Sequence, residues 1–329
     1  MTRPLAGALG ALALSVAAAF AQEGPAQGSA PALTIAAQEA GTVNWELDTI
    51  EHHGLDAAEG FDLRVRPVAG SSAGQIAFEA GEVDAIVSDW LWVARQRAAG
   101  RDYVFIPYSK AVGGVMVPEA SEAETLADLA GGAIGVAGGP LDKSWLILRA
   151  YASAEHGMDL VAETTQSFGA PPLIYKTAVD GGLDGAVNYW HWQAKMEAEG
   201  MRELVSVATA AEALGLDPET PLLGYVLRGE TLRESPELAE GLAAASREAK
   251  RLLAEDDAAW ERLRPLMNAD SEAQFEALVA GFRAGIPAEG PVDEEAAGRM
   301  LALMAELGGS DLVGDLRELP EGVFVQPAS

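Results

Sequence analysis

An internal repeat constrains the fold of this chain more than any other feature of its sequence. Residues 81–92 align without a gap on residues 181–192, and from 81–100 to 181–200 eight of twenty positions are identical. The same offset of 100 residues pairs Trp45 with Trp145, in addition to Trp90 with Trp190. Such a period is too long for a solenoid and predicts two copies of one β-α-β-α-β lobe.

Short apolar runs alternate with helical segments in both halves of the repeat, which is typical of parallel sheets with right-handed crossovers. Strands are predicted over 33–37, 61–68, 85–88, 104–108, 133–136, 164–167, 185–188 and 204–207. Helices are predicted over 43–53, 72–80, 90–99, 144–154, 171–180 and 190–199. From Ser235 onward the pattern is helical, with helix ends near 255, 267, 284 and 307.

The N-terminal segment is typical of an export signal. Arg3 provides a positive start, residues 5–20 are apolar or small, and Ala19-Phe20-Ala21 matches a signal-peptidase site. A membrane anchor is the other interpretation, but the run is short for a membrane span. We expect cleavage after Ala21, a flexible tether over 22–31, and a periplasmic protein without membrane insertion.

Charge and cysteine content exclude several classes of partner. The chain has no cysteine, so it has neither a disulfide nor a lipobox cysteine. Its net charge is −28, and the signal peptide contains no acidic residue, which argues against nucleic acid or anionic lipid as a partner. We expect a soluble monomer.

Ligands of such sheets bind beyond the carboxyl ends of the strands, so the function is predicted to lie between the two lobes. The residues expected to bind a ligand there are Gln38, Glu39, Trp45, Ser71, Ser72, Asp89, Trp90, Lys143, Ser144, Phe168, Asn188, Tyr189 and Trp190. Residues 138–144 follow a strand and open a helix, so their N–H groups could hold an anion. Alternatively, Asp142 simply caps that helix.

Paired tryptophans give the sharpest expectation about the cleft. Trp90 and Trp92 lie about 200° apart around a helix, so both cannot face one cleft, and Trp190 and Trp192 repeat this arrangement. We expect Trp90 and Trp190 to face each other across the ligand while the other two pack on their own sheets. The alternative is that all four belong to the core. Aromatic faces beside carboxylates suit a flat ring or an amine.

Catalysis, cofactors and metal binding find little support in the sequence. There is no cysteine nucleophile and no Gly-x-Ser-x-Gly elbow. The four histidines lack the spacing of zinc ligands, and His191 is expected to pack or to hydrogen-bond. No catalytic residue, cofactor or metal site is therefore predicted.

Several degenerate motifs in a fixed order resemble one family. They are Gly81–Ala85, Asp128–Val136, Gly138–Ser144, Tyr225–Arg228 and Ser235–Leu238. Together, over residues 33–267, they resemble the nitrate/sulfonate/taurine (SsuA/THI5-like) class of periplasmic substrate-binding proteins of ABC transporters. The resemblance implies a type II periplasmic-binding-protein fold of class α/β, with a ligand cleft between two β-α-β lobes. Lobe 1 would comprise 32–110 and 224–329, and lobe 2 would comprise 111–223.

The resemblance implies a solute-binding receptor that delivers a small molecule to the membrane permease of an ABC importer. Because Glu39, Asp89 and Asp142 crowd the ligand loops, a neutral aromatic or cationic amine is favoured. Three alternatives remain open: a binder of a sulfonate or nitrate anion, a same-fold enzyme of the thiamine-pyrimidine or menaquinone pathway, and a sensor or chaperone-like module. The segments 108–114 and 220–224 are predicted to cross between the lobes as hinges.

Overall fold

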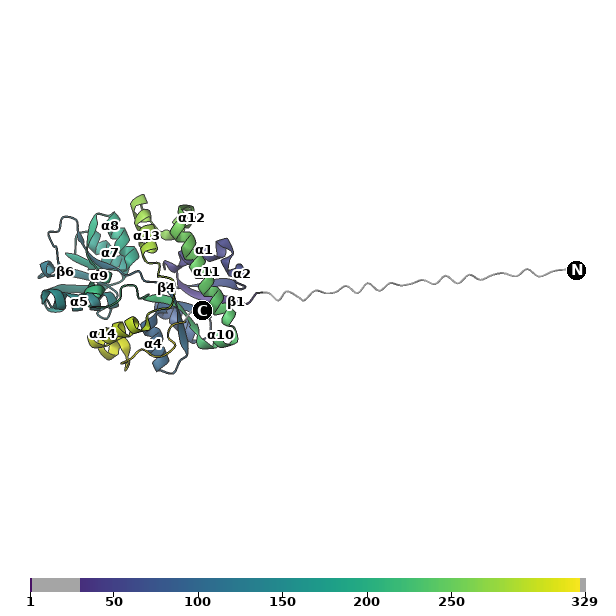
Figure 1. Ribbon diagram of the computed structural model, residues 1–329. Coiled ribbons are helices and arrows are strands. Elements are labelled where there is room, and N and C mark those ends of the chain that lie inside the picture. The colour runs from purple at the N-terminus through teal and green to yellow at the C-terminus, as the bar shows by residue number, and fades with distance from the viewer. Residues whose placement is uncertain (2–29, 326–329) are drawn as a thin grey trace.

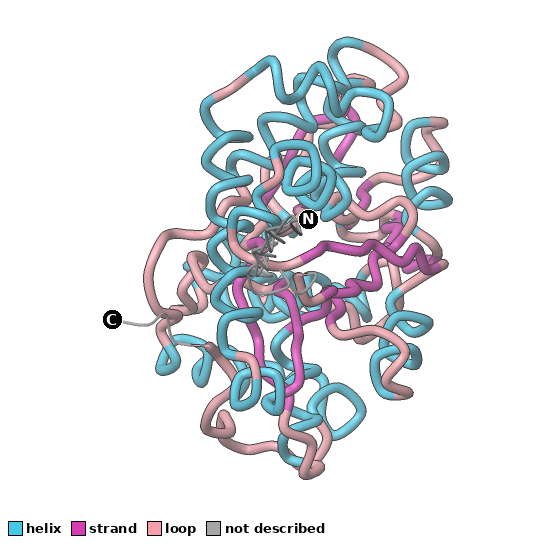
Figure 2. Tube along the Cα trace, turned by 90° about the vertical axis from the view of Figure 1, so that its right-hand side faces the viewer, coloured by secondary structure: helices cyan, strands magenta, loops and turns pink. Residues whose placement is uncertain are grey.

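The computed structural model describes Met1 and residues 30–325 of the chain (Figure 1). The predicted signal peptide at 1–21, apart from Met1, and most of the tether at 22–31 lie outside the described residues. Two five-stranded sheets, called sheet A and sheet B, form two lobes that lie side by side. In the view of Figure 2 the strands lie inside the molecule, with helices around them.

Sheet A has the strand order β2-β1-β3-β10-β4. Its strands are β1 (Ala32–Gln38), β2 (Asp62–Val68), β3 (Ala85–Asp89), β4 (Tyr103–Ser109) and β10 (Leu223–Arg228). β1 pairs in parallel with β2 and β3, whereas β10 runs antiparallel to β3 and β4. The helices connecting the strands of this lobe are α1 (Val43–His53), α2 (Leu55–Ala58), α3 (Ser71–Glu79) and α4 (Trp90–Ala98).

Sheet B repeats this plan in the order β7-β6-β8-β5-β9. Its strands are β5 (Gly114–Pro118), β6 (Ala133–Ala137), β7 (Thr165–Gly169), β8 (Gly185–Val187) and β9 (Met201–Ser206). Its helices are the 3-10 helix η1 (Leu126–Leu129), α5 (Lys143–His156), α6 (Leu160–Glu163), α7 (Pro171–Val179), α8 (Trp190–Ala198) and α9 (Val207–Ala213).

The C-terminal helices join the two lobes. They are α10 (Gly229–Glu234), α11 (Pro236–Glu255), α12 (Asp257–Met267), α13 (Glu272–Ala284) and α14 (Glu294–Val313). α13 packs against α8 of the sheet B lobe, and α14 packs against both α4 and α5. In Figure 1, α13 lies above the junction of the lobes and α14 lies below it.

Alternation of side chains along the strands explains the layers. Ile35 and Ala85 point to the face of sheet A that α1 covers, whereas Ala36 and Ile86 pack on the face covered by α3 and α4. The second of these cores continues through Met300 of α14 into the core beneath α5. The two lobes therefore share one continuous apolar cluster.

The internal repeat corresponds to a structural repeat. Asp84 and Asp184 stand just before β3 and β8, and each carboxylate accepts a backbone N–H from the neighbouring strand, that of Thr34 (2.8 Å) and that of Ala133 (2.7 Å). The same bond fixes the register of the two central strands in both sheets. The alignment of residues 81–92 on 181–192, which predicts equivalent places for these two aspartates, is confirmed.

Two strands and several boundaries differ from the sequence prediction. β5 and β10 were not predicted as strands, because they enter their sheets antiparallel and outside the strand-helix alternation. β9 begins at Met201, and Val207, expected to end that strand, begins α9. α14 extends to Val313 across a break at Gly309, where φ is 58°. In the described part of the chain, no helix is long and apolar enough to cross a membrane.

Candidate functional site

The carboxyl ends of the strands meet helix starts that are capped by carboxylates. Asp89 ends β3 and its Oδ1 accepts the backbone N–H of Trp92 at 2.9 Å. Asp142 precedes α5 and its Oδ1 accepts the backbone N–H of Trp145 at 3.1 Å. Each aspartate satisfies an N–H that would otherwise have no partner at the start of its helix. The capping role expected for Asp142 is confirmed.

An ion pair joins these two strand ends across the junction of the lobes. Lys143 Nζ lies 3.2 Å from Asp89 Oδ2, and their side chains are 30% and 22% exposed. Asp89 ends a strand of sheet A, whereas Lys143 begins the helix after a strand of sheet B. The charge of Asp89 raises the pKa of Lys143, against a smaller opposing effect of burial. The lysine therefore stays charged and bridges two otherwise separate loops.

Tyr189 completes this cluster from the next strand end. Its hydroxyl lies 3.5 Å from the place where a Cβ on Gly138 would stand, and Gly138 has a φ of +87° that favours glycine. Burial and the nearby Asp142 raise the pKa of Tyr189, and burial raises the pKa of Asp142. We call Asp89, Asp142, Lys143 and Tyr189 the strand-end cluster. The sequence analysis expected Asp142 to cap its helix and to add negative charge to the ligand loops, but it did not include Asp142 among the ligand-binding residues.

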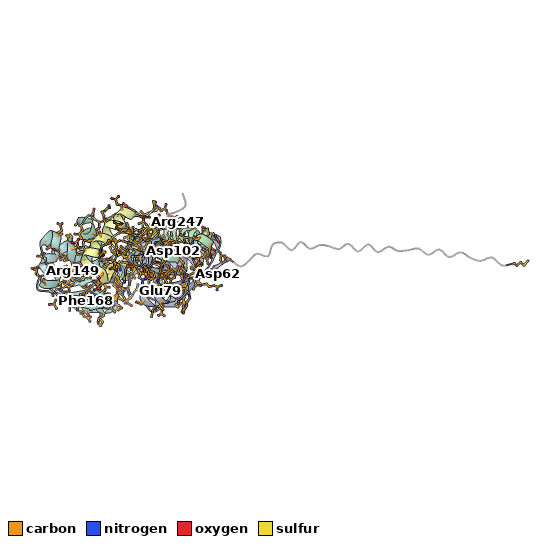
Figure 3. All side chains as sticks on the ribbon, turned by 90° about the horizontal axis from the view of Figure 1, so that it is seen from below. Asp62, Glu79, Asp102, Arg149, Phe168 and Arg247 are labelled. Carbon is orange, nitrogen blue, oxygen red and sulfur yellow. The ribbon has the colours of Figure 1, made fainter. Side chains whose placement is uncertain are left out.

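Two aromatic rings at this edge remain open to solvent. Tyr189 is 42% exposed and Phe168, in the edge strand β7, is 41% exposed. Figure 3 shows Phe168 in the sheet B lobe, at the opposite end of the molecule from Asp62. Exposed rings of this size can receive a ligand by stacking.

The sheet A side of the cleft presents polar groups. Gln38 Nε2 donates to Ser71 Oγ at 2.8 Å, and both side chains are exposed. Glu39 and Ser72 are exposed as well. α3 begins at Ser71 without a side-chain cap, so its first N–H groups keep their capacity to bind a ligand.

The tryptophans do not lie as expected. Trp90 has no exposed surface, and its ring packs 5.9 Å from that of Phe324. Trp190 instead contacts Trp45 edge-on at 6.0 Å, and Trp45 itself is 4% exposed. The expectation that Trp90 and Trp190 face each other across one cleft is therefore wrong. Trp92 stacks on Tyr103 of β4 at 5.6 Å, which agrees with the expectation that it packs on its own sheet.

Trp192 and Asn188 have structural partners. The ring of Trp192 lies 5.2 Å from that of Tyr175 in α7, so it packs against a neighbouring helix. Asn188 is 2% exposed, and its amide donates to Pro171 O at 3.0 Å, which fixes the start of α7. Ser144 is half-buried next to Lys143.

The lowered pKa of His191 predicts how the stability of the folded protein depends on pH. Burial, and to a lesser degree the charge of Lys195, lowers the pKa of its imidazole to about 4. Histidine in the unfolded chain has a pKa of about 6.5. Between this pH and about 4, the unfolded state therefore binds a proton that the folded state does not bind. The stability contribution is complete above pH of about 6.5 and falls as the pH drops toward about 4.

Replacing His191 with asparagine should flatten that part of the pH profile, by at most about 3 kcal/mol because the ring keeps some exposure. Urea denaturation at intervals between neutral and acidic pH measures the difference between the two proteins. Parallel profiles for both would contradict a neutral, buried His191.

Comparisons with known proteins agree with this architecture. The family model described as NMT1/THI5 like matches residues 51–259, which is more than half of the chain. None of the curated proteins compared matches the sequence significantly.

Solved structures extend the likeness over most of the chain. The alkanesulfonate-binding protein SsuA from Xanthomonas axonopodis pv. citri, bound to MOPS, is 18% identical with a TM-score of 0.67, over 91% of this chain and 99% of that chain. The aliphatic sulphonate binding protein SsuA from Escherichia coli is 18% identical with a TM-score of 0.68, over 89% and 95%. The desulfurization enzyme DSZB is 16% identical with a TM-score of 0.57, over 89% and 97%. At such identities the likeness establishes the fold alone, and the predicted two-lobed α/β periplasmic-binding fold is confirmed.

Proposed function

Because this chain belongs to the NMT1/THI5-like family, we propose that it is a solute-binding receptor whose two lobes close on a small organic ligand. It would be exported by the segment 1–21, act in the periplasm as a monomer, and deliver the ligand to the permease of an ABC importer. The single observation that supports ligand capture best is the Asp89–Lys143 ion pair, because it links the facing strand ends of the two sheets. The lobe boundaries 32–110 with 224–329, and 111–223, are part of this proposal.

A receptor fits the chemistry of the strand-end cluster better than an enzyme does. Asp89 and Asp142 are engaged as helix caps, and Lys143 is paired with Asp89. The chain has no cysteine to act as a nucleophile. The same fold in a desulfurization enzyme keeps the enzyme alternative open to test, since fold alone does not fix function.

For the ligand, we propose a neutral aromatic compound or a cationic amine. The exposed rings of Phe168 and Tyr189 offer stacking surfaces, and Glu39 adds an exposed carboxylate. The strand-end cluster holds two carboxylates against one ammonium, so an added anion would meet net negative charge. Asp142 also occupies the helix start at which an anion could otherwise bind.

A sulfonate is the second candidate, and one feature favours it. The uncapped start of α3 exposes Ser71 and Ser72, whose hydroxyls and N–H groups are suitable donors to an anion. The SsuA proteins of similar fold are described as sulfonate binders.

Replacing Asp89 with asparagine separates the two ligand classes. Binding of a cationic amine should weaken by roughly 10- to 100-fold, because a hydrogen bond to a charged group is lost, while a neutral ring should lose much less. Titration calorimetry with amines, pyrimidines, aliphatic sulfonates and nitrate measures this.

The matched control is Asp62→Asn, which removes one carboxylate from an exposed ion pair at the start of β2. It should leave every affinity unchanged. Tight binding of a sulfonate that survives Asp89→Asn, without any response to amines or pyrimidines, would replace our ligand proposal by the second candidate.

A further inference from the structure

A cavity of about 440 Å³ lies at the junction of the lobes, apart from the strand-end cluster. Its walls are α8, α13, the end of β9, and the two segments that cross between the sheets at Lys110 and Pro218. Of the residues predicted to bind a ligand, only Trp190 lines it. We call it the hinge cavity.

Small side chains on α13 create the hinge cavity. Ala277, Ala280, Gly281 and Ala284 lie at positions i, i+3, i+4 and i+7, so they share one face of the helix, and all four line the cavity. A Cβ on Gly281 would stand 2.8 Å from the ring of Trp190, so the glycine allows the two helices to approach closely. The alanines beside it leave the remaining space unfilled.

The opposite wall carries acidic and amide groups. Glu197, Glu203 and Gln193 all line the cavity, and the Gln193 amide nitrogen donates to Glu203. Gln193 is 7% exposed, and its Oε1 is buried with no hydrogen-bond partner among the residues that the structure describes. A buried amide oxygen without a donor costs free energy unless a bound group supplies one.

Positive charge is scarce around these carboxylates. Lys110, at the rim, is held by Glu219 at 2.6 Å, so its charge is already balanced. Burial, followed by the charge of Glu203, raises the pKa of Glu197. The site therefore holds two neighbouring carboxylates, and a bound cation would reduce the repulsion between them.

We propose that the hinge cavity binds a small organic cation, a primary ammonium or guanidinium with a short apolar chain. Its N–H groups would donate to the carboxylates of Glu203 and Glu197, which line one wall of the cavity. Its apolar part would lie against the alanine face of α13 and the ring of Trp190. A cavity of this volume is in the usual range for a small ligand. The inference does not depend on which ligand the strand-end cluster takes.

Titration of the full-length mature protein with butylammonium and methylguanidinium chloride tests the site, with butane-1-sulfonate as the anionic counterpart. Calorimetry and the change in tryptophan fluorescence report binding. We expect both cations to bind and the sulfonate to leave the fluorescence unchanged. Glu203→Gln should weaken cation binding by roughly 10- to 100-fold.

Ala280→Leu provides a second variant, because it fills the cavity from an exposed position without changing charge. It should also weaken cation binding. Glu212→Gln, on the exposed side of α9, is the charge-matched control and should bind as the parent protein does. Absence of binding by both cations would overturn the proposal. So would cation binding that is lost in Asp89→Asn but kept in Glu203→Gln, since the cation would then occupy the strand-end cluster.

Discussion

Replacing Lys250 with methionine is expected to lower the free energy of unfolding by about 3 to 5 kcal/mol. Lys250 Nζ lies 2.8 Å from Glu46 Oε2 in the core between α1 and α11, where the Glu46 side chain has no exposed surface. Breaking a buried ion pair from one side leaves a buried charge without its counter-charge. The methionine has the volume of the lysine stem, so the lost charge dominates the effect.

The surroundings of the pair explain why it is tolerated in the native protein. Tyr225 donates its hydroxyl to Glu46 Oε1 at 2.8 Å, and Ser246 donates to the same oxygen at 2.6 Å. Lys250 Nζ also donates to Ser246 Oγ at 2.5 Å and lies 5.0 Å from the ring centre of Tyr108. Tyr225 and Ser246 still donate to the carboxylate when only the lysine is removed, but neither carries a charge that balances it.

Urea denaturation followed by tryptophan fluorescence measures the loss. A double variant, Glu46→Gln with Lys250→Met, should recover part of the stability, because the amide oxygen still accepts from Tyr225 and Ser246 without carrying charge. Lys176→Met breaks the exposed pair with Asp180 and should leave the unfolding midpoint unchanged. If Lys250→Met were as mild as Lys176→Met, the pair would not be a determinant of stability.

Helix and strand positions were predictable where one local pattern fixed them. α1 spans Val43–His53 as predicted, because apolar spacing and the glycine at 54 mark both ends. β5 and β10 escaped prediction because their pairing is non-local: each lies antiparallel between strands distant in sequence. Nothing in a short run such as Gly114–Pro118 indicates which strands it will join.

The sequence predicted where the residues of the candidate site lie on their own sheets, but not which of them contact each other. The rule of carboxyl strand ends placed Asp89 and Lys143 correctly on the edges of their sheets. Their contact depends on how the two lobes face each other, and a hydrophobic pattern in the sequence carries no information about this orientation. The prediction that Trp90 faces the cleft was wrong because Phe324, far along the chain, packs against its ring. Phe324 is held there by a β-bridge to Phe105 of β4.

The glycines of the crossing segment 108–114 are a further case. Because this segment was predicted to be a hinge, glycine there was expected to allow a change of backbone conformation. Gly113 and Gly114 do not adopt positive φ, and a Cβ on Gly113 would stand 1.9 Å from the carbonyl oxygen of Asn188. One on Gly114 would stand 2.7 Å from the carbonyl oxygen of Val205. Close approach of two backbones therefore requires glycine at both positions in this arrangement, while their role as hinges stays a prediction.

Gly113→Ala is consequently expected to disfavour the arrangement in which the crossing segment lies against the start of α8. A Cβ cannot approach a backbone oxygen so closely, so the segment, or Asn188 with Tyr189 beside it, must move. Overpacking of this kind costs about 1 to 3 kcal/mol, and if ligand binding requires this arrangement, affinity falls by roughly 5- to 150-fold. Small-angle scattering with and without the tightest binder of the calorimetric panel should show less compaction than in the parent protein.

Gly224→Ala, in β10 just after the second crossing, is the comparable variant on that side, since its Cβ would stand 2.4 Å from the ring of Phe105 and from Ile106 O. Gly298→Ala, in the middle of α14 with open space around the new methyl group, is the control and should leave affinity and compaction unchanged. The affinity of Gly113→Ala decides whether the crossing takes part in capture. If that variant bound ligand and contracted as the parent protein does, the close contact between Gly113 and Asn188 would be a packing detail, and closure would have to pivot elsewhere.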